Sequence, residues 1–471
     1  MNFYTDLEQY HERIAIITEG GERLSYQQFL EEGDQLMTNL PERKVLFLVC
    51  RNCLESVCAY IAALRKGIVP VMINAGIDAS LFQHLYEAYH PSYIFAPQEW
   101  KILENLTLQE MDKYRSFVMC QTSWKESYEI HPDLALLLTT SGSTGSPKLV
   151  RQSYKNIVSN ANSIAEYLEI QPEDCAITTM PMSYTYCLSI INSHLLRGAT
   201  VIMNDYSIVQ KEFWTLMKEE KPTTFGGVPF IYEQLKTLRF ARMNLPTLKY
   251  LTQAGGKLSK EMAEEFYTIC KEKNMKFIVM YGQTEATARM SYLPWEYAKE
   301  KAGSIGIAIP GGEFSLIDAE DKEIKEADVT GELVYRGDNV TLGYAESDRD
   351  LAKGDERHGI LYTGDMAKRD KDGFYYIVGR KKRFLKLFGN RVNLDEVEMI
   401  LKKQGYSCVC AGVDDKLSIY TTDQDVAIHE EMKKYIGLVL GLHVKGFEVK
   451  YIEEIPRNDS GKVAYSMLDS I

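Results

Sequence analysis

The sequence predicts an α/β protein built on parallel β-sheets, with a β-rich subdomain and a small α+β domain toward its C-terminus. From about residue 25, short apolar runs alternate with stretches of helical periodicity. Near Ile305 this alternation gives way to Gly-rich segments in which apolar residues occur at every second position. A chain of 471 residues, 45% hydrophobic and 25% charged, is long enough for two or three domains and excludes a disordered or coiled-coil protein.

The first elements follow a strand–helix–strand rhythm. Ser25 and Gln28 have the spacing of a capping box, which predicts a helix through Leu36. A strand is expected at 45–49, a helix at 54–66 that Gly67 stops, a strand at 68–73, a helix at 79–89 and a strand at 92–96. Strands that alternate with helices in this way favour a parallel sheet covered by helices.

The same rhythm resumes at residue 134. Strands are expected at 134–138, 200–203, 248–252 and 277–280, each followed by a helical stretch. Ligands of open α/β sheets bind beyond the carboxyl ends of the strands. The loops after Leu138 and after Met280 are therefore the expected places for a site.

The remaining third of the chain has a different pattern of apolar residues and glycines. Residues 303–344 are expected to form hairpins, 370–373 a turn and 374–378 a strand. The charged stretch 379–383 is the candidate linker. The last ~90 residues return to mixed α/β patterns and are long enough for a small domain.

Charge and cysteine content narrow the class of function. The 54 Lys and Arg against 66 Asp and Glu give a net charge of −12, which lacks the basic footprint of a nucleic-acid or anionic-membrane binder. The N-terminus has no signal-peptide pattern, and no apolar run approaches the ~18 residues that span a bilayer. Nine cysteines, an odd number, fit reduced thiols. We expect a cytoplasmic protein with no nucleic-acid partner and no transmembrane segment; its oligomeric state stays open.

The sharpest local feature is the loop TTSGSTGSPK at residues 139–148, directly after an apolar strand. Glycines let backbone N–H groups turn inward as an anion nest, and a lysine supplies a point charge for a polyphosphate. No Gly-Lys-Ser/Thr triplet is present, so this is not a Walker motif, and a flexible linker is the alternative. The expected phosphate-binding residues are Thr140, Ser141, Gly142, Ser143, Thr144, Gly145 and Lys148.

Residues 141–148 resemble the phosphate loop of the adenylate-forming (AMP-binding) superfamily, which includes acyl-CoA synthetases, peptide-synthetase adenylation domains and luciferases. Further segments match that family in chain order: AGG at 254–256, YGQTE at 281–285, GEL at 331–333, YTGD at 362–365, GR at 379–380 and PRNDSGK at 456–462. The resemblance implies a large N-terminal adenylation domain at 1–379, a hinge at 380–383 and a small mobile domain at 384–471.

The resemblance also implies roles for single residues in the large domain. Tyr281 would stack on adenine, Thr284 would bond the α-phosphate, and Glu285 would hold Mg²⁺, a hard oxygen ligand for a hard cation. The remaining nucleotide-binding positions would be Gly255, Gly256, Gly282, Gln283, Asp365 and Arg380. Asp365 would accept both ribose hydroxyls, which suits a carboxylate with two acceptor oxygens.

Three positions near the C-terminus complete the implied machinery. Lys382 would be the hinge, and Lys462 would enter the active site during adenylation. Gly389 would open a narrow path for a phosphopantetheine thiol, because a missing side chain permits close approach.

The acid pocket departs from amino-acid activators of the family. Their ammonium-binding Asp aligns with Thr185, so a cationic ammonium would lose its ion-pair partner. The sequence therefore favours an acid without an α-ammonium group. Tyr184 and Thr185 are the candidate pocket residues, although core packing is the commoner reason for such residues.

The expected reaction has two halves and resembles that of an acyl- or aryl-CoA synthetase. A carboxylate attacks the α-phosphorus of ATP and pyrophosphate leaves; no general base is needed because the carboxylate is already an anion. The acyl group then passes to a thiol. ATP, Mg²⁺ and either coenzyme A or an acyl carrier protein are the implied cofactors and partners. A kinase that releases ADP and a non-catalytic nucleotide-binding protein are the rival classes.

Overall fold

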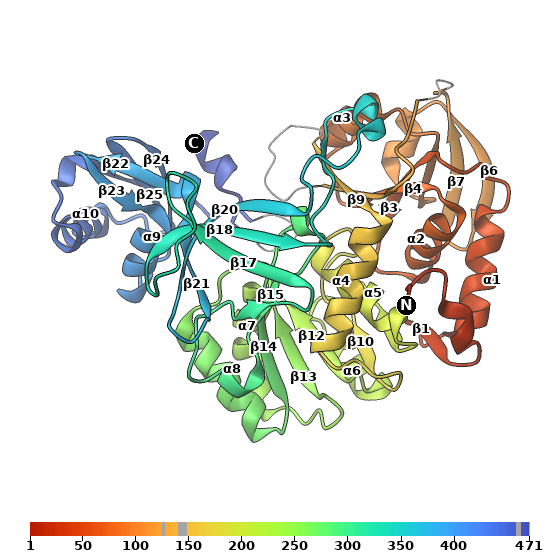
Figure 1. Ribbon diagram of the computed structural model, residues 1–471, viewed down its shortest axis with the longest axis horizontal. Coiled ribbons are helices and arrows are strands. Elements are labelled where there is room, and N and C mark those ends of the chain that lie inside the picture. The colour runs from red at the N-terminus through yellow and green to blue at the C-terminus, as the bar shows by residue number, and fades with distance from the viewer. Residues whose placement is uncertain (125–127, 140–147, 458–462, 471) are drawn as a thin grey trace. The chain divides into compact units, whose positions relative to one another are not determined.

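A computed structural model describes residues 1–124, 128–139, 148–457 and 463–470 (Figure 1). The chain divides into two compact units, Met1–Glu313 with Tyr335–Leu361, and Phe314–Val334 with Tyr362–Ile471. The predicted α/β class with a β-rich part and a smaller C-terminal α+β part is confirmed. The predicted boundaries at 379 and 383 concern domain motion, which this division by packing does not test.

The first unit is built on two large mixed sheets. One has eight strands in the order β19-β9-β8-β4-β3-β5-β7-β6. Their bounds are β3 (Val45–Cys50), β4 (Val69–Asn74), β5 (Tyr93–Pro97), β6 (Leu108–Tyr114), β7 (Phe117–Thr122), β8 (Leu134–Thr139), β9 (Leu149–Ser153) and β19 (Gly343–Ala345).

The other sheet has nine strands in the order β16-β15-β14-β13-β12-β10-β11-β1-β2. Their bounds are β1 (Ile14–Thr18), β2 (Arg23–Ser25), β10 (Cys175–Ile177), β11 (Thr200–Met203), β12 (Thr224–Gly227), β13 (Tyr250–Gln253), β14 (Lys276–Tyr281), β15 (Ser291–Tyr292) and β16 (Ile307–Ala308). The strands from β14 through β12, β10 and β11 to β1 are parallel, so their carboxyl ends share one edge.

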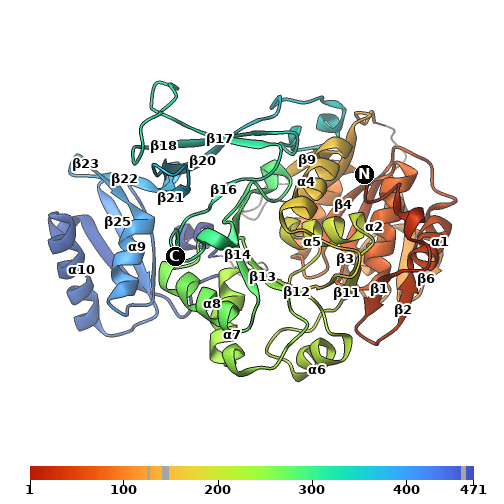
Figure 2. The ribbon, with the colours of Figure 1, turned by 60° about the horizontal axis from the view of Figure 1, so that its bottom comes forward.

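Helices cover both faces of these sheets, as the views in Figures 1 and 2 show. On β3, Leu46 and Leu48 face the core shared with the inner helices, whereas Phe47 faces the outer helix α3. The core on the outer face of the nine-stranded sheet includes residues of α6, α7 and α8. The helices are α1 (Tyr26–Met37), α2 (Leu54–Lys66), α3 (Ala79–Tyr89), α4 (Tyr154–Tyr167), α5 (Thr185–Leu196), α6 (Lys211–Glu220), α7 (Pro229–Thr237) and α8 (Lys260–Glu272).

Local signals account for the helix ends. Ser25 Oγ accepts from Gln28 N at 3.2 Å and Gln28 Oε1 accepts from Ser25 N at 2.9 Å, so the predicted capping box is confirmed. Gly67 ends α2 with φ of 72°, a conformation that an L side chain rarely adopts. Every residue of α5 is buried, which places this helix inside the unit.

Two expected strand–helix steps are wrong. The strand β8 is followed by β9, which returns antiparallel beside it, before α4 begins. The strand β14 is followed by one 3-10 turn, η4 (Thr284–Ala286), and by the antiparallel strand β15. Both loops expected to carry a site are therefore closed by strand pairing, which fixes their ends more tightly than a connection to a helix.

The second unit holds most of a four-stranded sheet, with the order β17-β18-β20-β21, and the C-terminal elements. The C-terminal core lies between two helices and two small sheets, β22-β23 and β24-β25-β26. The strands are β17 (Gly312–Ile317), β18 (Thr330–Gly337), β20 (Ile360–Arg369), β21 (Tyr375–Arg380), β22 (Phe384–Leu387), β23 (Asn390–Asn393), β24 (Cys408–Val413), β25 (Lys416–Thr421) and β26 (Phe447–Tyr451), and the helices are α9 (Leu394–Lys403) and α10 (Val426–Leu440).

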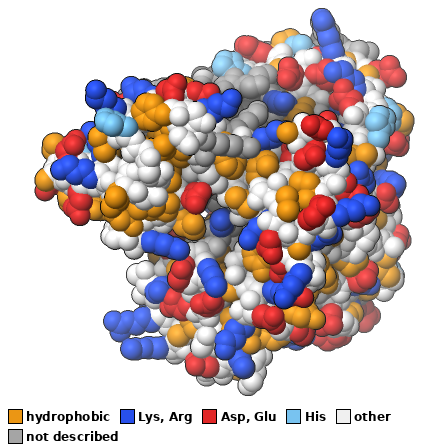
Figure 3. All heavy atoms as spheres, turned by 60° about the vertical axis from the view of Figure 1, so that its left-hand side comes forward, with side chains coloured by type: hydrophobic (Ala, Val, Ile, Leu, Met, Phe, Trp, Pro, Cys, Tyr) orange, Lys and Arg blue, Asp and Glu red, His pale blue; other side chains and the backbone are white. Residues whose placement is uncertain are grey.

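Short 3-10 turns complete the chain: η1 (Leu7–Tyr10), η2 (Lys101–Asn105), η3 (Phe240–Arg242), η5 (Trp295–Tyr297), η6 (Asp348–Ala352), η7 (Lys381–Arg383), η8 (Val444–Gly446) and η9 (Tyr465–Ser470). Within the described ranges, no helix has the length and hydrophobicity needed to cross a membrane. The face drawn in Figure 3 carries acidic and basic side chains intermixed rather than one large patch of either sign.

Candidate active site

The loop that joins β14 to β15 doubles back on itself with almost no free space. A Cβ at Gly282 would lie 1.7 Å from the carbonyl oxygen of Ala288, so only glycine fits there. Thr287 has φ of 66°, and Met290 N donates to the carbonyl of Tyr281 at 2.8 Å. The Tyr281–Gly282 motif predicted from the sequence is thus the start of a tight, closed loop.

Asn339, a buried residue, fixes this loop from the segment between β18 and β19. Its side-chain Nδ2 donates to the carbonyl of Ala286 at 2.9 Å, and its backbone carbonyl accepts from Thr287 Oγ1 at 2.7 Å. Tyr335 donates its hydroxyl to Asn339 Oδ1 at 2.8 Å. The amide is therefore held on both sides, which limits the positions that the loop can adopt.

Glu285 is fixed at both its backbone and its carboxylate. Its carbonyl oxygen accepts from Thr341 N at 3.0 Å, from Thr341 Oγ1 at 2.9 Å and from Arg357 Nη1 at 2.9 Å. Its carboxylate oxygen Oε1 accepts from the hydroxyl of Tyr344 at 2.7 Å. A short bond to an ionised acceptor is of the stronger kind and orients the carboxylate.

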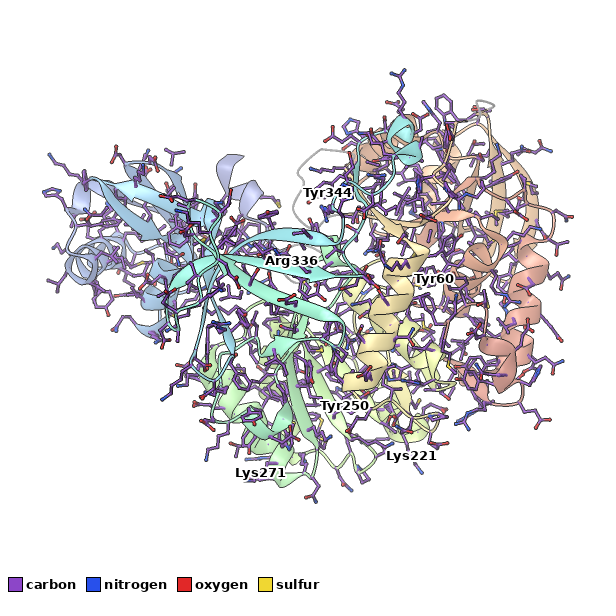
Figure 4. The ribbon with its side chains drawn as sticks, viewed as in Figure 1. Tyr60, Lys221, Tyr250, Lys271, Arg336 and Tyr344 are labelled. Atoms are coloured by element: carbon purple, nitrogen blue, oxygen red, sulfur yellow. The ribbon has the colours of Figure 1, made fainter. Side chains whose placement is uncertain are left out.

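Tyr344 connects this loop to the predicted phosphate loop. It lies on β19, where it pairs with Val150 of β9, two residues after Lys148 (Figure 4). The ammonium of Lys148 lies 3.7 Å from the centre of the Tyr344 ring and the guanidinium of Arg357 lies 4.7 Å from it. Burial, reinforced by the charge of Glu285, raises the pKa of Tyr344 to about 12, so its hydroxyl is a neutral donor at pH 7.

The structure thus brings Lys148 and Glu285 together through a residue that the sequence reasoning missed. No signal in the sequence marks Tyr344 or Arg357, because each meets Glu285 across a long stretch of chain. Two groups of predicted residues lie outside the described residues: the phosphate-loop positions Thr140, Ser141, Gly142, Ser143, Thr144 and Gly145, and the C-terminal Lys462.

The surroundings of Glu285 fit a divalent cation. Among the described residues no donor reaches its second oxygen, Oε2, and the side chain is half-buried. In the same part of the chain no three His, Cys, Asp or Glu side chains are grouped as metal ligands. Mg²⁺ is commonly held by one or two carboxylates, waters and substrate phosphates, so a single oriented carboxylate is what such a site requires.

The other predicted nucleotide residues of this unit lie around the ends of the strands. Gln283 donates through Nε2 to the hydroxyl of Tyr281 at 3.1 Å, and Thr284 begins η4 beside Glu285. At Gly255, where φ is 83°, a Cβ would lie 2.6 Å from the Tyr184 hydroxyl. A Cβ at Gly256 would lie 3.1 Å from Pro229 Cγ. The two glycines let the chain approach α7 and the N-terminus of α5 closely.

The two residues expected in the acid pocket lie at the start of α5. Tyr184 precedes the helix, and burial raises its pKa. Thr185 is buried and donates its hydroxyl to the carbonyl of Thr287. The Thr185 hydroxyl is therefore used within the protein, where it attaches α5 to the Glu285 loop, and the expected role of Thr185 in the acid pocket stays a prediction.

In the second unit, Asp365 and Arg380 face each other as partners on the antiparallel strands β20 and β21. Asp365 is buried and its Oδ1 lies 3.4 Å from Arg380 Nε, whereas Arg380 is 66% exposed. Thr363 donates to the carbonyl of Leu333 at 2.7 Å and accepts from Asp365 N at 3.1 Å. The YTGD segment of β20 therefore presents a buried carboxylate beside an exposed cation.

The model of one protein family, described as AMP-binding enzyme, matches residues 3–345, well over half of the chain. The chain belongs to the AMP-binding enzyme family.

Relatives of this AMP-binding enzyme include 2-succinylbenzoate–CoA ligase of Enterococcus faecalis, 24% identical, with 90% of this chain and 88% of the relative covered. Long-chain-fatty-acid–CoA ligase FadD13 of Mycobacterium tuberculosis is 28% identical, with 89% and 86% covered. O-succinylbenzoate coenzyme A synthetase (MenE) of Bacillus subtilis, solved with ATP and magnesium ion, has a TM-score of 0.80 at 22% identity and 99% coverage of both chains. This structural likeness shows that the fold is shared.

The residues predicted as hinge and thiol path lie in two short turns of this AMP-binding enzyme. Lys382 lies in η7, directly after β21. Gly389 and Phe388, with φ of 83° and 50°, form the two-residue turn between β22 and β23, where Leu387 pairs with Asn390. Positive φ at both positions is typical of a type I′ hairpin, and a Cβ at Gly389 would meet nothing within 4 Å. Turn geometry therefore explains this glycine without a narrow path, and its role toward a thiol stays a prediction.

Proposed function

We propose that this chain activates a carboxylic acid with ATP, releases pyrophosphate and transfers the acyl group from the acyl-adenylate to the thiol of coenzyme A. The observation that carries the proposal is the cluster of Lys148, Tyr344 and Glu285, which lies at the loops after β8 and β14. It unites a cation suited to phosphates with an oriented carboxylate suited to a metal, in a member of the AMP-binding family.

In the first half-reaction, a substrate carboxylate oxygen attacks the α-phosphorus and the bond to the β-phosphate oxygen breaks. The enzyme must stabilise the negative charge that spreads over the phosphate oxygens in the transition state. Lys148 would act on the β- and γ-phosphates, and the hydroxyl of Thr284 and the ammonium of Lys462 on the α-phosphate. Mg²⁺, held by Glu285, would neutralise phosphate charge.

Adenine and ribose would be held by groups of matching chemistry. Tyr281 would offer an aromatic face to the base, beside Gly282 and Gln283, and the closely packed backbone at Gly255 and Gly256 would line the nucleotide site. Asp365 would accept ribose hydroxyls and Arg380 would approach the phosphates.

In the second half-reaction, the thiol attacks the acyl carbon and AMP leaves. We propose that the domain 384–471 turns about Lys382, which withdraws Lys462 and admits the thiol past Gly389. Coenzyme A is proposed as acceptor because the relatives are named CoA ligases. An acyl carrier protein is the alternative acceptor and would load by the same chemistry.

The proposed location is the cytoplasm. All nine cysteines are free, and seven of them are buried thiols whose pKa values burial raises, which suits a reducing compartment that supplies ATP and coenzyme A.

An ATP–pyrophosphate exchange screen over aliphatic, aryl and dicarboxylic acids tests the first half-reaction. Glu285→Gln keeps the shape of the side chain and removes its negative charge. It should slow exchange with the best acid at least a hundredfold. The acids that exchange are then offered coenzyme A and a phosphopantetheinylated carrier protein in parallel. Exchange with no acid, or ADP as the nucleotide product, would contradict the proposal.

A further inference from the structure

Arg151, on β9, is a fully buried arginine whose side chain binds one segment of the chain, residues 342–356. The five N–H groups of its guanidinium meet five acceptors, all of them in this segment. The acceptors are the backbone carbonyls of Leu342, Tyr344, Lys353 and Gly354 and the carboxylate of Glu356. The guanidinium therefore fixes the backbone that it binds, because its removal would leave part-buried carbonyls without a donor.

These contacts join the two ends of the segment. Near its start, Nε lies 3.0 Å from the carbonyl oxygen of Tyr344 and Nη2 lies 3.1 Å from that of Leu342. At its end, Nη1 lies 3.1 Å from the carbonyl oxygen of Gly354 and Nη2 lies 2.5 Å from the carboxylate of Glu356. Glu356 N also donates to the carbonyl of Leu342 at 2.9 Å. Start and end of the segment thus meet at one guanidinium.

Gly343 leaves the space that this arrangement needs. It pairs with Arg151 across β19 and β9, and its φ of 127° is one that L side chains rarely adopt. A Cβ there would lie 3.0 Å from Arg151 Nη2 and 2.6 Å from Glu356 Oε2. The glycine therefore lets the guanidinium and the carboxylate meet over the strand.

Both ends of the segment lie beside a residue that binds Glu285. Tyr344 donates its hydroxyl to Glu285 Oε1 at 2.7 Å, and Arg357, the residue after Glu356, donates to the carbonyl of Glu285 at 2.9 Å. A shift of the segment would move both donors away from Glu285. Among the described residues, all side-chain hydrogen bonds of Arg151 go to this segment, so its effect on Glu285 passes through the segment.

We propose that Arg151 is the positioning residue for the metal-binding carboxylate: it fixes the backbone of Tyr344, and Tyr344 in turn orients Glu285 toward Mg²⁺. This inference rests on the proposed function, in which Glu285 holds the metal. Because Arg151 acts through Tyr344 and not on a substrate, disturbing it should weaken the hold on Mg²⁺ and leave the choice of acid unchanged.

Arg151→Lys keeps a cation beside Glu356 and replaces the planar fork of five donors by three. The donor to the Tyr344 carbonyl is lost, so the Mg²⁺ concentration for half-maximal pyrophosphate exchange should rise about three- to tenfold, as for the loss of one hydrogen bond. The KM for the acid should not change. Glu356→Gln is a milder change of the same cluster, since it removes the paired charge and keeps an acceptor, and it should shift the Mg²⁺ requirement in the same direction.

Arg43→Lys is the matched control. Arg43 is a half-buried arginine whose Nη1 donates to the carbonyl of Leu134 at 3.0 Å, at the amino end of β8 and away from the predicted phosphate loop. This variant also loses bonds between a guanidinium and backbone carbonyls, so its Tm should fall as well. Its Mg²⁺ requirement should stay that of the wild type, which separates positioning from stability.

A double variant tests the route through Tyr344. In the Tyr344→Phe background, Arg151→Lys should raise the Mg²⁺ requirement by less than about twofold, because the hydroxyl through which Arg151 acts is already gone. A general loss of stability would not produce this difference between the two backgrounds. Full multiplication of the two single effects, or an unchanged Mg²⁺ requirement in Arg151→Lys, would overturn the inference.

The Mg²⁺ dependence of ATP binding gives a readout without turnover. ATP should raise the Tm of the wild type only with Mg²⁺, and Arg151→Lys should need more Mg²⁺ than Arg43→Lys for the same shift. That result from an enzyme that exchanges pyrophosphate with no acid would support the inference and contradict the proposed function. Normal exchange with equal Mg²⁺ requirements in the two variants would support the proposed function and overturn the inference. A wild type with neither exchange nor a Mg²⁺-dependent shift would contradict both.

Discussion

Replacing Tyr344 by Phe should slow adenylation without disturbing the fold. The substitution deletes one hydroxyl, and with it the 2.7 Å hydrogen bond to Glu285 Oε1. The ring that lies 3.7 Å from the Lys148 ammonium stays in place, so the contact with the phosphate loop is kept. Tyr344→Phe therefore separates the orientation of the carboxylate from the packing of the lysine.

The size of the effect follows from the burial of the bond. A hydrogen bond to a charged group contributes about 1.5–3 kcal/mol, and because both side chains are half-buried the lower part of that range applies. If the full bond acts in the transition state, about 1.5–2 kcal/mol corresponds to roughly a 10- to 30-fold loss in kcat/KM. Tyr344→Ala also removes the ring and should lose more.

Pyrophosphate exchange at several Mg²⁺ concentrations measures this effect. Tyr344→Phe should need more Mg²⁺ for half-maximal rate, since Glu285 is no longer oriented. Tyr128→Phe is a matched control, because it too deletes one hydroxyl from a half-buried tyrosine. The Tyr128 hydroxyl donates to backbone carbonyls instead, at 3.0 Å to Tyr89 and 3.1 Å to His90. Exchange by Tyr344→Phe within twofold of the control, with an unchanged Mg²⁺ requirement, would refute the reasoning.

Three further predictions concern other parts of the chain. Lys462→Ala should slow adenylate formation by several powers of ten while thioester formation from supplied acyl-adenylate changes little; equal losses in both steps would defeat the two-state assignment. Lys382→Pro should spare pyrophosphate exchange and suppress thioester formation, because proline fixes φ near −65° at the proposed hinge, and normal thioester rates would remove the hinge from the account. Burial lowers the pKa of His194 from 6.5 to about 4, so the unfolded chain binds a proton in that window that the folded chain does not. Stability should therefore fall by up to about 3 kcal/mol as pH decreases from about 6.5 to 4, and His194→Gln should flatten this part of the slope in urea unfolding.

The elements that could be predicted from the sequence are those whose ends depend on neighbouring residues. The capping box at Ser25 and the glycine after Lys66 act within a few residues, so α1 begins and α2 ends where the pattern indicates. The strand β9 was not predicted, because it pairs with β8 across the predicted phosphate loop. The Gly- and Ser-rich sequence of that loop does not indicate that an antiparallel strand follows it. Expecting a helix after each strand failed where antiparallel pairing, a non-local interaction, decided the structure.

The candidate site was predictable only where the chemistry lies in contiguous motifs. Glu285 stood out because it follows a strand within YGQTE, whereas Tyr344 meets it from 59 residues away and Arg357 from 72. At Gly389 a local signal has a local explanation. The hairpin turn alone is enough to require this glycine, for which a role in the path of the thiol was expected.

Oxygen transfer tests the central claim, acid adenylation, most directly. The enzyme is incubated with ATP, Mg²⁺, coenzyme A and its best acid labelled with ¹⁸O in the activated carboxylate, and the nucleotide products are analysed by mass spectrometry. Because a carboxylate oxygen bonds to the α-phosphorus and stays there when the thiol displaces the adenylate, one ¹⁸O should appear in AMP, with pyrophosphate unlabelled. Label in inorganic phosphate with ADP as the nucleotide product would mean attack at the γ-phosphorus and would contradict the account.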